Sequence, residues 1–439
     1  MQEITRTIVR FRATRLITGI FIMTGLVLTD PPRSHTAGKT YVAEFGSSSV
    51  GVIDGPTRKV VGHIAVPRGA HGLAIIPDGS RVFVSSDESA IITVIDASKD
   101  EVIGTIPTGK QPHGLAVGSG GRFVYAAVFG DNQVLEINPR TLKVERTFDV
   151  ANPHNLAPSP DGTDLFVASQ KPGETCIADI DVRSGTIRST IPTLTAPRSL
   201  NVSPDGTILC ATFFDSNQVN FYSTHPFKGT GAVPVGNSPH HVTFTPDGSL
   251  VLVVNQVSND LTLIDSGTRK VTGNIKVGRK PHWISPTMDS KYAYVTDEGS
   301  NEVSFVDLEE KEVEQTLTVG LAPRKIAVQP HPDASAKMWT AGGHSASAMG
   351  EGDTVVVKIQ GPPPRFAPST LTVRAGTTVE WVNTAKGLHT VTDDTGQWDS
   401  GSLSPGEKFS RRFTEPGTYP YYCIPHRAMG MVGTIIVKE

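Results

Sequence analysis

Hydrophobic and polar residues alternate along most of this chain in short runs that turn residues separate. From His71 onward, four such runs follow one another: HGLAII, RVFVSS, ITVIDA and VIGTIP. The tripeptide PDG at 77–79 lies between the first two runs, and Asp and Gly tolerate the positive φ that a tight hairpin turn needs. The pattern therefore predicts four short strands joined by tight turns.

This four-run pattern recurs with a nearly constant period. Related units begin every 41 to 44 residues after His71, at His113, His154, Arg198, His240, His282 and Arg324. The PDG turn recurs at 160–162, 204–206 and 246–248. A period of about 40 to 45 residues with four strands per unit is typical of a propeller blade.

The two ends of the repeat array complement each other. Six complete units occupy 71–323, the segment RKIAVQP at 324–330 supplies one innermost strand, and 41–66 supplies three further strands. Together they predict a seventh blade, because a ring closed by strands from both ends leaves no exposed sheet edge. We therefore predict a seven-bladed β-propeller over residues 38–330.

Three segments of the array also resemble a known family. YVAEFGSSSVGVID (41–54), FVSSDESAIITVID (83–96) and YVTDEGSNEVSFVD (294–307) resemble the repeats of the bacterial YVTN propellers. The resemblance implies the propeller fold. It implies little about chemistry, because propellers host many unrelated functions.

The C-terminal part of the chain has a different pattern. Residues 331–353 break the repeat and are rich in Ala, Gly and Ser, which favours an interdomain linker. Across 354–439, short alternating runs such as VVVKI, LTVRAGTTVEWVN and MVGTIIVKE predict a small β-sandwich. The whole chain is therefore expected to be all-β, a propeller followed by a sandwich.

The predicted sandwich carries the side chains of a copper site. The segments FAPSTLTVRAGTTVEWVN (366–383), LHTV (388–391) and GTYPYYCIPHRAMGMVG (417–433) resemble the cupredoxins of the plastocyanin and pseudoazurin type. A buried cysteine, a histidine or a core methionine is commonplace alone. A thiolate, two imidazoles and a weak axial thioether together suit a copper ion that exchanges one electron. The resemblance implies one type 1 copper with the ligands His389, Cys423, His426 and Met431.

The axial ligand has two candidates. Met431 follows Cys423 by eight residues, as in the longer-loop plastocyanin and pseudoazurin pattern, whereas Met429 follows it by six, as in a shorter-loop variant. We favour Met431, because AMGM as a whole copies the longer loop.

The surroundings of the copper site depart from the family in one place. Thr390 follows the first ligand histidine where the family often has Asn. We expect Thr390 or Asn383 to supply the hydrogen bond that tightens the site, and such outer partners tune a redox potential. The resemblance also makes the imidazole edge of His426, between Pro425 and Ala428, the expected electron port.

A second set of histidines lies in the propeller repeats. Equivalent positions of all blades lie on one circle around the channel, and five of the seven at the start of the units are histidines: His71, His113, His154, His240 and His282. Arg198 and Arg324 complete the seven, and His241 adjoins His240. One interpretation is that the histidine belongs to the repeat consensus and caps a turn. The other is a metal site, with additional copper, or a substrate site at the channel mouth.

Two functional hypotheses follow. In the first, the protein is a copper-dependent oxidoreductase of the multicopper oxidase or nitrogen-oxide reductase type, in which the type 1 site feeds copper at the propeller histidines and dioxygen, nitrite or nitrous oxide is reduced. Nitrous oxide reductase combines similar domains, but its two-copper centre needs two cysteines and this loop has only Cys423. In the second, the protein is a non-enzymatic blue-copper electron carrier or copper-binding protein, with the propeller as a docking scaffold. Both require a redox partner protein or a small electron donor.

Composition and the N-terminal sequence limit the possible partners and location of the protein. A net charge of −3 without blocks of like charge argues against a nucleic-acid partner, and the oligomeric state stays open. Arginines 6, 10, 12 and 15, the apolar run at 16–28 and SHTA at 34–37 predict a signal peptide or an uncleaved membrane anchor over 1–37. We therefore expect a periplasmic or extracellular protein.

The cysteine count fits the copper assignment. The chain has three cysteines, Cys176, Cys210 and Cys423, so an exported protein has at least one thiol outside a disulfide. We expect Cys423 to be that thiol, and Cys176 and Cys210 to be two buried free thiols or a disulfide.

Overall fold

The structure, a computed structural model, describes residues 38–329, 354–361, 364–394 and 398–438. The predicted signal peptide or anchor (1–37) and the predicted linker (331–353) lie outside the described residues. Within the described ranges, no helix is long and apolar enough to cross a membrane. The described residues contain three short 3-10 turns, η1 (Ser119–Gly121), η2 (Phe129–Asp131) and η3 (Ile424–Met429). All other regular structure in the described residues is β-strand.

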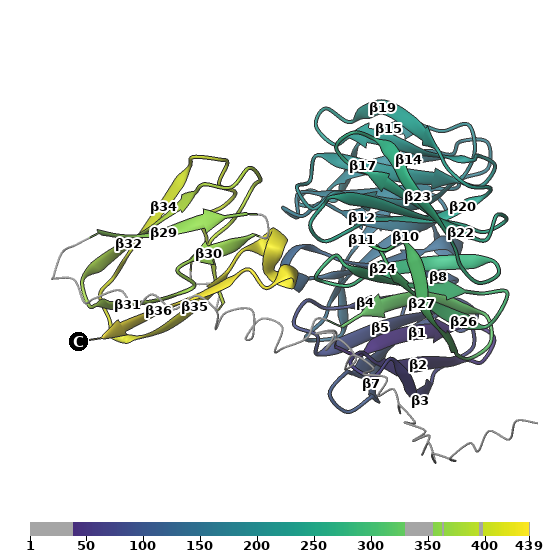
Figure 1. The fold of residues 1–439 in the computed structure, drawn as a ribbon, viewed down its shortest axis with the longest axis horizontal. Helices are drawn as coiled ribbons and strands as arrows, with labels where there is room; N and C mark the ends of the chain where they lie inside the picture. The colour runs from purple at the N-terminus through teal and green to yellow at the C-terminus, as the bar shows by residue number, and fades with distance from the viewer. Residues whose placement is uncertain (1–37, 330–353, 362–363, 395–397, 439) are drawn as a thin grey trace, which may run out of the picture. The chain divides into compact units, whose positions relative to one another are not determined.

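Seven four-stranded antiparallel sheets form the propeller, coloured purple to green in Figure 1. The strands of the first three complete blades are β4 (Ala70–Ile75), β5 (Arg81–Ser86), β6 (Ile91–Asp96) and β7 (Glu101–Pro107); β8 (Pro112–Val117), β9 (Val124–Val128), β10 (Gln133–Asn138) and β11 (Lys143–Asp149); and β12 (Pro153–Pro158), β13 (Asp164–Ser169), β14 (Cys176–Asp181) and β15 (Thr186–Pro192). The next three blades consist of β16 (Pro197–Val202), β17 (Ile208–Phe213), β18 (Gln218–Ser223) and β19 (Lys228–Pro234); β20 (Pro239–Phe244), β21 (Leu250–Asn255), β22 (Asp260–Asp265) and β23 (Lys270–Lys276); and β24 (Pro281–Pro286), β25 (Tyr292–Asp297), β26 (Glu302–Asp307) and β27 (Glu312–Thr318).

Burial explains the hydrophobic pattern of each blade. The second strand, such as β5, is buried along nearly its whole length, whereas the outermost strand, such as β7, is mostly exposed. Inner strands are covered on both faces by the neighbouring blades and therefore need apolar residues throughout. The two outer strands of every blade also share a register shift at one repeat position, between Val94 and Ile95 in the first complete blade.

The ring closes with strands from both ends of the repeat array. The strand β28 (Pro323–Val328) pairs with β1 (Thr40–Glu44), followed outward by β2 (Ser49–Asp54) and β3 (Lys59–Ala65). β28 also contacts the innermost strands β24 and β4 on either side. The buried Glu44 carboxylate of β1 accepts hydrogen bonds from Gly320 N at 2.7 Å and Ser49 Oγ at 2.6 Å. The predicted seven blades, with the last one shared between the ends, are confirmed.

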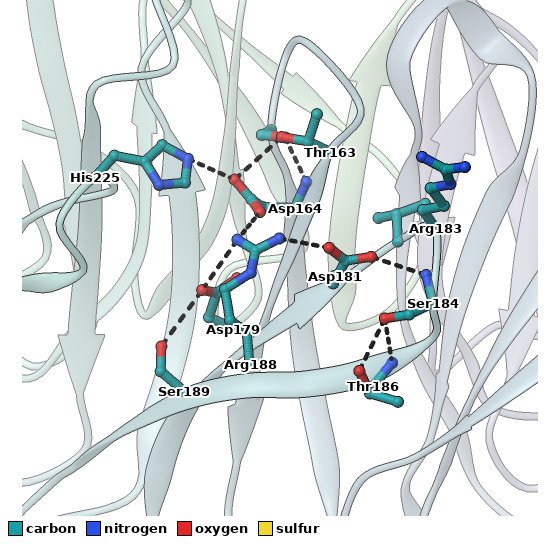
Figure 2. Close-up of polar contacts among 12 residues, drawn as sticks. Thr163, Asp164, Asp179, Asp181, Arg183, Ser184, Thr186, Arg188, Ser189 and His225 are labelled. Atoms are coloured by element: carbon teal, nitrogen blue, oxygen red, sulfur yellow. Dashed lines mark hydrogen bonds and ion pairs between the residues drawn. The ribbon is translucent and has the colours of Figure 1, made fainter.

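One cluster of charged side chains belongs to the blade of β12 to β15 and the loop that carries His225. Figure 2 shows the Arg188 guanidinium between three carboxylates, with its nitrogens 2.6 Å from Asp164 and 2.8 Å from Asp181 and a longer 3.6 Å contact to Asp179. His225 Nε2 lies 2.8 Å from the second oxygen of Asp164, whose side chain is only 1% exposed. A buried carboxylate is stable only with such partners.

The C-terminal residues form two four-stranded sheets (Figure 1). One contains β29 (Thr354–Gln360), β30 (Arg365–Ala367), β32 (Thr377–Asn383) and β34 (Lys408–Phe413), and the other contains β31 (Thr370–Arg374), β33 (Thr392–Asp393), β35 (Gly417–Tyr422) and β36 (Val432–Lys438). Their inner faces share one core built around Trp381, Phe366 and Tyr421. The predicted β-sandwich is confirmed.

The two propeller cysteines are free thiols. Cys210 on β17 is buried between blades, as expected. Cys176, at the start of β14, is only partly buried, which differs from the expectation of two buried thiols, because it occupies the strand end beside the preceding loop.

Candidate metal centre

The copper ligand loop is held by its own backbone. Cys423 follows β35 and begins η3, and Met431 follows η3. The Cys423 N–H donates to the Met431 carbonyl at 2.9 Å, and the Met431 N–H donates to the His426 carbonyl at 3.0 Å. Gly430 ends η3 at φ 78°, in the left-handed region that glycine adopts without strain. The loop therefore presents Cys423, His426 and Met431 from one compact turn.

His389 reaches the same place from another part of the sandwich. It forms an isolated bridge with Leu403, in which the His389 N–H donates to the Leu403 carbonyl at 3.1 Å and the Leu403 N–H donates to the His389 carbonyl at 2.7 Å. Asn383 Nδ2 donates to the carbonyls of Leu403 and Gly387, both at 2.8 Å. Asn383 thus positions the segment that carries His389, which is the outer role that the sequence assigned to Asn383 or Thr390.

The donor atoms of His389, Cys423 and His426 converge. All three lie within 4.8 Å of one another, with the Cys423 Sγ 3.6 Å from His389 Nδ1 and 3.3 Å from His426 Nδ1. For an ion bound at about 2.3 Å from sulfur and about 2.0 Å from nitrogen, two ligand atoms lie roughly 3.5 to 3.7 Å apart. The spacing therefore fits a single shared metal ion.

Thr390 contacts the sulfur. Its backbone N–H points at Cys423 Sγ from 3.3 Å, and its Oγ1 accepts from the Ile424 N–H at 2.7 Å. A hydrogen bond to a thiolate disperses its negative charge and favours the ionised form. Thr390 therefore links the first ligand strand to the ligand loop.

Burial sets the protonation of these ligands. It lowers the pKa of His389 to about 4, and burial with the neighbouring His389 lowers the pKa of His426 to about 3, so both imidazoles are neutral and can offer a lone pair. Burial raises the pKa of the Cys423 thiol to about 12, so a cation must displace its proton. His426 is 7% exposed and His389 2%, so His426 is the more accessible imidazole.

The structure brings the five repeat histidines together in the propeller. His71, His113, His154, His240 and His282 line one small cavity, part of which is open to solvent. Their rings contact one another at a tilt, with centroids 3.9 Å apart for His71 and His113 and 4.0 Å apart for His113 and His154. Burial holds the pKa of all five below the ordinary value, to about 4 for His154.

This ring differs from the copper site in its spacing. Among the described residues, His389, Cys423 and His426 have ligand atoms that all lie within 4.8 Å of one another. No three histidines of the ring do. His241 is separate from the cavity lining, because its ring stacks on Trp283 with centroids 3.3 Å apart.

Six residues that line the cavity are absent from the sequence-based prediction, and two of them have large side chains. Trp283 and Lys325 line the same cavity as the histidines. Lys325 Nζ lies 4.3 Å from the Trp283 ring and donates to the Leu115 carbonyl at 2.6 Å, so the side chain extends from β28 to β8, two blades away. Both residues follow the ring position by one, and the repeat alignment therefore contained a signal for them.

The fold and this donor set define a class: a blue-copper cupredoxin domain joined to a β-propeller. Residues 353–438 match the model of the copper binding proteins of the plastocyanin/azurin family. The plastocyanin of Scenedesmus fuscus is 40% identical over 84 residues, which are 17% of this chain and 86% of the relative. The chain therefore belongs to the plastocyanin/azurin family through its C-terminal domain. It binds copper as its cofactor, as that family does.

Other relatives are longer than the matched region. The chloroplastic plastocyanin of Chlamydomonas reinhardtii is 42% identical over 84 residues, and the chain spans only 58% of its length. The plastocyanin of Prochlorothrix hollandica is 39% identical over 84 residues, and the chain spans 64% of its length.

Solved structures match the propeller in fold. Kuenenia stuttgartiensis hydrazine synthase superimposes with a TM-score of 0.59 at 20% identity, over 65% of this chain and 99% of that chain. The dihydro-heme d1 dehydrogenase NirN superimposes with a TM-score of 0.50 at 17% identity, over 66% of each chain. At such identities the likeness extends to the fold alone.

Proposed function

We propose that this protein is an exported blue-copper electron carrier that takes up and releases one electron at a time at its C-terminal domain. The observation that carries the proposal is the convergence of one thiol and two neutral imidazoles at a spacing suited to one ion. Bound copper supplies a one-electron couple. Met431 is the axial ligand in this proposal.

The protein side chains hold the site in one geometry. The bridge between His389 and Leu403 and the backbone bonds of the ligand loop keep the donor atoms in place without the metal. A site that is already arranged changes little between two oxidation states, which favours fast electron transfer. The more accessible imidazole of His426 is the proposed port toward a redox partner protein or a small electron donor.

Export and partner choice are part of the same proposal. The basic residues and the apolar run within 1–37 support export to the periplasm or the cell exterior, by secretion or by an anchor. The propeller then serves as the surface for docking a partner, a common use of this fold.

An enzymatic role for the propeller is the weaker alternative. It would need additional copper at His71, His113, His154, His240, His241 and His282. The five that line the cavity favour it by converging, but their ligand atoms are spaced too widely for three of them to share one ion. We therefore favour the carrier.

Replacing Cys423 with serine tests the copper proposal. The copper-loaded protein should show an intense visible absorption from thiolate-to-copper charge transfer, and Cys423→Ser should abolish it because a serine oxygen is a harder and less covalent ligand. Absorption spectra of the copper-loaded proteins measure this.

The matched control is Cys176→Ser, which removes a partly buried thiol of the propeller and should leave the colour unchanged. Colour that survives in Cys423→Ser would contradict the proposal.

A further inference from the structure

The propeller cavity contains cations without carboxylate partners. Arg198 and Lys325 both line it. The Arg198 guanidinium lies 4.1 Å from the Phe214 ring and 3.3 Å from Gln256 Oε1, and among the described residues no carboxylate lies within 4.0 Å of it. The negative charges of Asp215 and Glu298 raise the pKa of Arg198, but both carboxylates lie more than 4.0 Å from its guanidinium.

Lys325 also lacks a carboxylate partner among the described residues. Its ammonium contacts the Leu115 carbonyl and the Trp283 ring, and no described carboxylate lies within 4.0 Å. Part of the residue stays accessible through the cavity, although protein surrounds the ammonium. A neutral carbonyl and an aromatic face compensate a buried charge only in part.

Three other arginines of the propeller, Arg188, Arg146 and Arg324, have carboxylate partners. Arg188 contacts three carboxylates, one of which belongs to the buried Asp164 (Figure 2). Arg146 forms two hydrogen bonds with the buried Glu136, at 2.8 and 2.7 Å. Arg324, the other arginine of the ring, lies 3.4 Å from Glu298. Arg198 and Lys325 differ from these three arginines, because neither has a carboxylate within 4.0 Å among the described residues.

Unpartnered nitrogen atoms lie on the same side of the ring. Going from blade to blade, the ring positions after Arg198 are His240, His282, Arg324 and His71. The Nδ1 atoms of His71, His240 and His282 are buried, and none has a hydrogen-bond partner among the described residues. His113 and His154, on the remaining arc, each place Nδ1 near a carbonyl of the next blade, at 3.1 and 2.9 Å. The three unpartnered imidazoles can thus carry their proton on either nitrogen.

We propose that this cavity is a binding site for a small inorganic oxyanion. Cations that are partly removed from water and have no carboxylate partner are costly, and an anion in the cavity that Arg198 and Lys325 line would offset their charge. The planar guanidinium can donate to two oxygens at once, and imidazole N–H groups on the adjoining arc supply further donors. This inference is independent of the copper proposal.

The test is a binding measurement on the full-length, copper-loaded protein. Nitrite, nitrate and sulfate are titrated by calorimetry at pH 6 in a low-salt buffer, with chloride as the comparison. Saturable binding of at least one oxyanion, with chloride at least tenfold weaker, is expected. Arg198→Gln should weaken the oxyanion at least tenfold, and Arg198→Lys should weaken it less because the charge remains.

The controls separate this inference from loss of fold and from the copper proposal. Arg269→Gln removes a guanidinium that also stacks on a phenylalanine, Phe221, at 4.8 Å, but belongs to a turn outside the cavity, and should bind as the wild type does. If Arg198→Gln does not fold, Lys325→Met tests instead whether a positive charge in the cavity is needed for oxyanion binding. The visible absorption should be equal in every variant that folds.

Three results would overturn the inference. These are the absence of saturable oxyanion binding to the wild type, equal binding by Arg198→Gln and the wild type, and two or more coppers per chain of which His113→Ala removes one. The last result would identify the ring as a metal site.

Discussion

Two methionines of the copper loop differ in their surroundings. Met431 is fully buried and belongs to the sandwich core with Cys423, and both its backbone groups bond to the ligand loop. Met429 ends η3 and is only partly buried. Met431, which the longer-loop spacing favours, therefore stays the proposed axial ligand.

The reduction potential distinguishes the two methionines. Met431→Gln should lower it, because an amide oxygen is a harder donor than a thioether and stabilises the cupric state, and Met431→Leu should raise it by removing the donor. Potentiometric titration of the visible absorption measures the shift. Met429→Leu is the control and should leave the potential nearly unchanged. A shift in that variant alone would make Met429 the axial ligand.

At the scale of an element, β25 carries a buried acid. Asp297 is fully buried, accepts a hydrogen bond from Ser304 Oγ at 2.7 Å through one oxygen, and has no partner for the other among the described residues. Burial raises its pKa to about 7, and Glu302 adds to the rise. At the same repeat position of β21 the residue is Asn255, whose amide donates to Asp260 and Thr262. The position therefore accepts an amide.

Asp297→Asn should change how propeller stability depends on pH. Because the pKa is higher in the folded than in the unfolded protein, the folded form binds more protons between about pH 4 and 7, and its stability falls as the pH rises through that window. The ionised acid costs on the order of 4 kcal/mol above pH 7. The amide avoids that cost, so the variant should be the more stable protein at pH 8.5, by on the order of 2 kcal/mol.

Denaturant unfolding at pH 5 and pH 8.5 measures the effect. The advantage of Asp297→Asn should shrink or reverse at pH 5, where the wild-type acid is protonated. Identical pH profiles for the two proteins would show that the acid does not titrate in this window.

At the scale of the whole molecule, each part has its own core. The sandwich core draws on residues from Val357 to Val437, and the propeller cores draw on residues from Tyr41 to Val328. Ile326, on the strand that closes the ring, packs against Val42 and Tyr294 and is only 1% exposed. The stability of the propeller therefore depends on contacts between the two ends of the repeat array.

Ile326→Ala should destabilise the propeller by about 2 to 4 kcal/mol, because it leaves a cavity in the closing blade. The sandwich should be unaffected. Chemical denaturation followed by circular dichroism for the whole chain and by the copper absorption for the sandwich separates the two transitions. The matched variant Ile435→Ala, in the sandwich core, should move only the copper-reported transition. If either variant shifts both transitions equally, the parts unfold as one unit.

The sequence by itself determined the blades, because they depend on local spacing, and its resemblance to the cupredoxins led to the candidate copper ligands. A blade is four strands joined by short turns, so alternation and a constant period are enough to predict it. Cys423, His426 and Met431 belong to one loop, and only His389 comes from elsewhere. Thr390 and Asn383 were both named as outer partners, and their separate contacts, to the sulfur and to the bridge at Leu403, became visible only in the structure.

The tertiary structure decided what depends on burial and on partners far apart in the chain. Whether Asp297 ionises, whether Cys176 is covered, and whether Lys325 reaches Leu115 follow from the packing of blades against one another. The repeat alignment placed five histidines and two arginines on one circle. It did not distinguish Arg324, which lies near Glu298, from Arg198, which has no carboxylate within 4.0 Å among the described residues. The charge of a cavity is set by every blade that surrounds it.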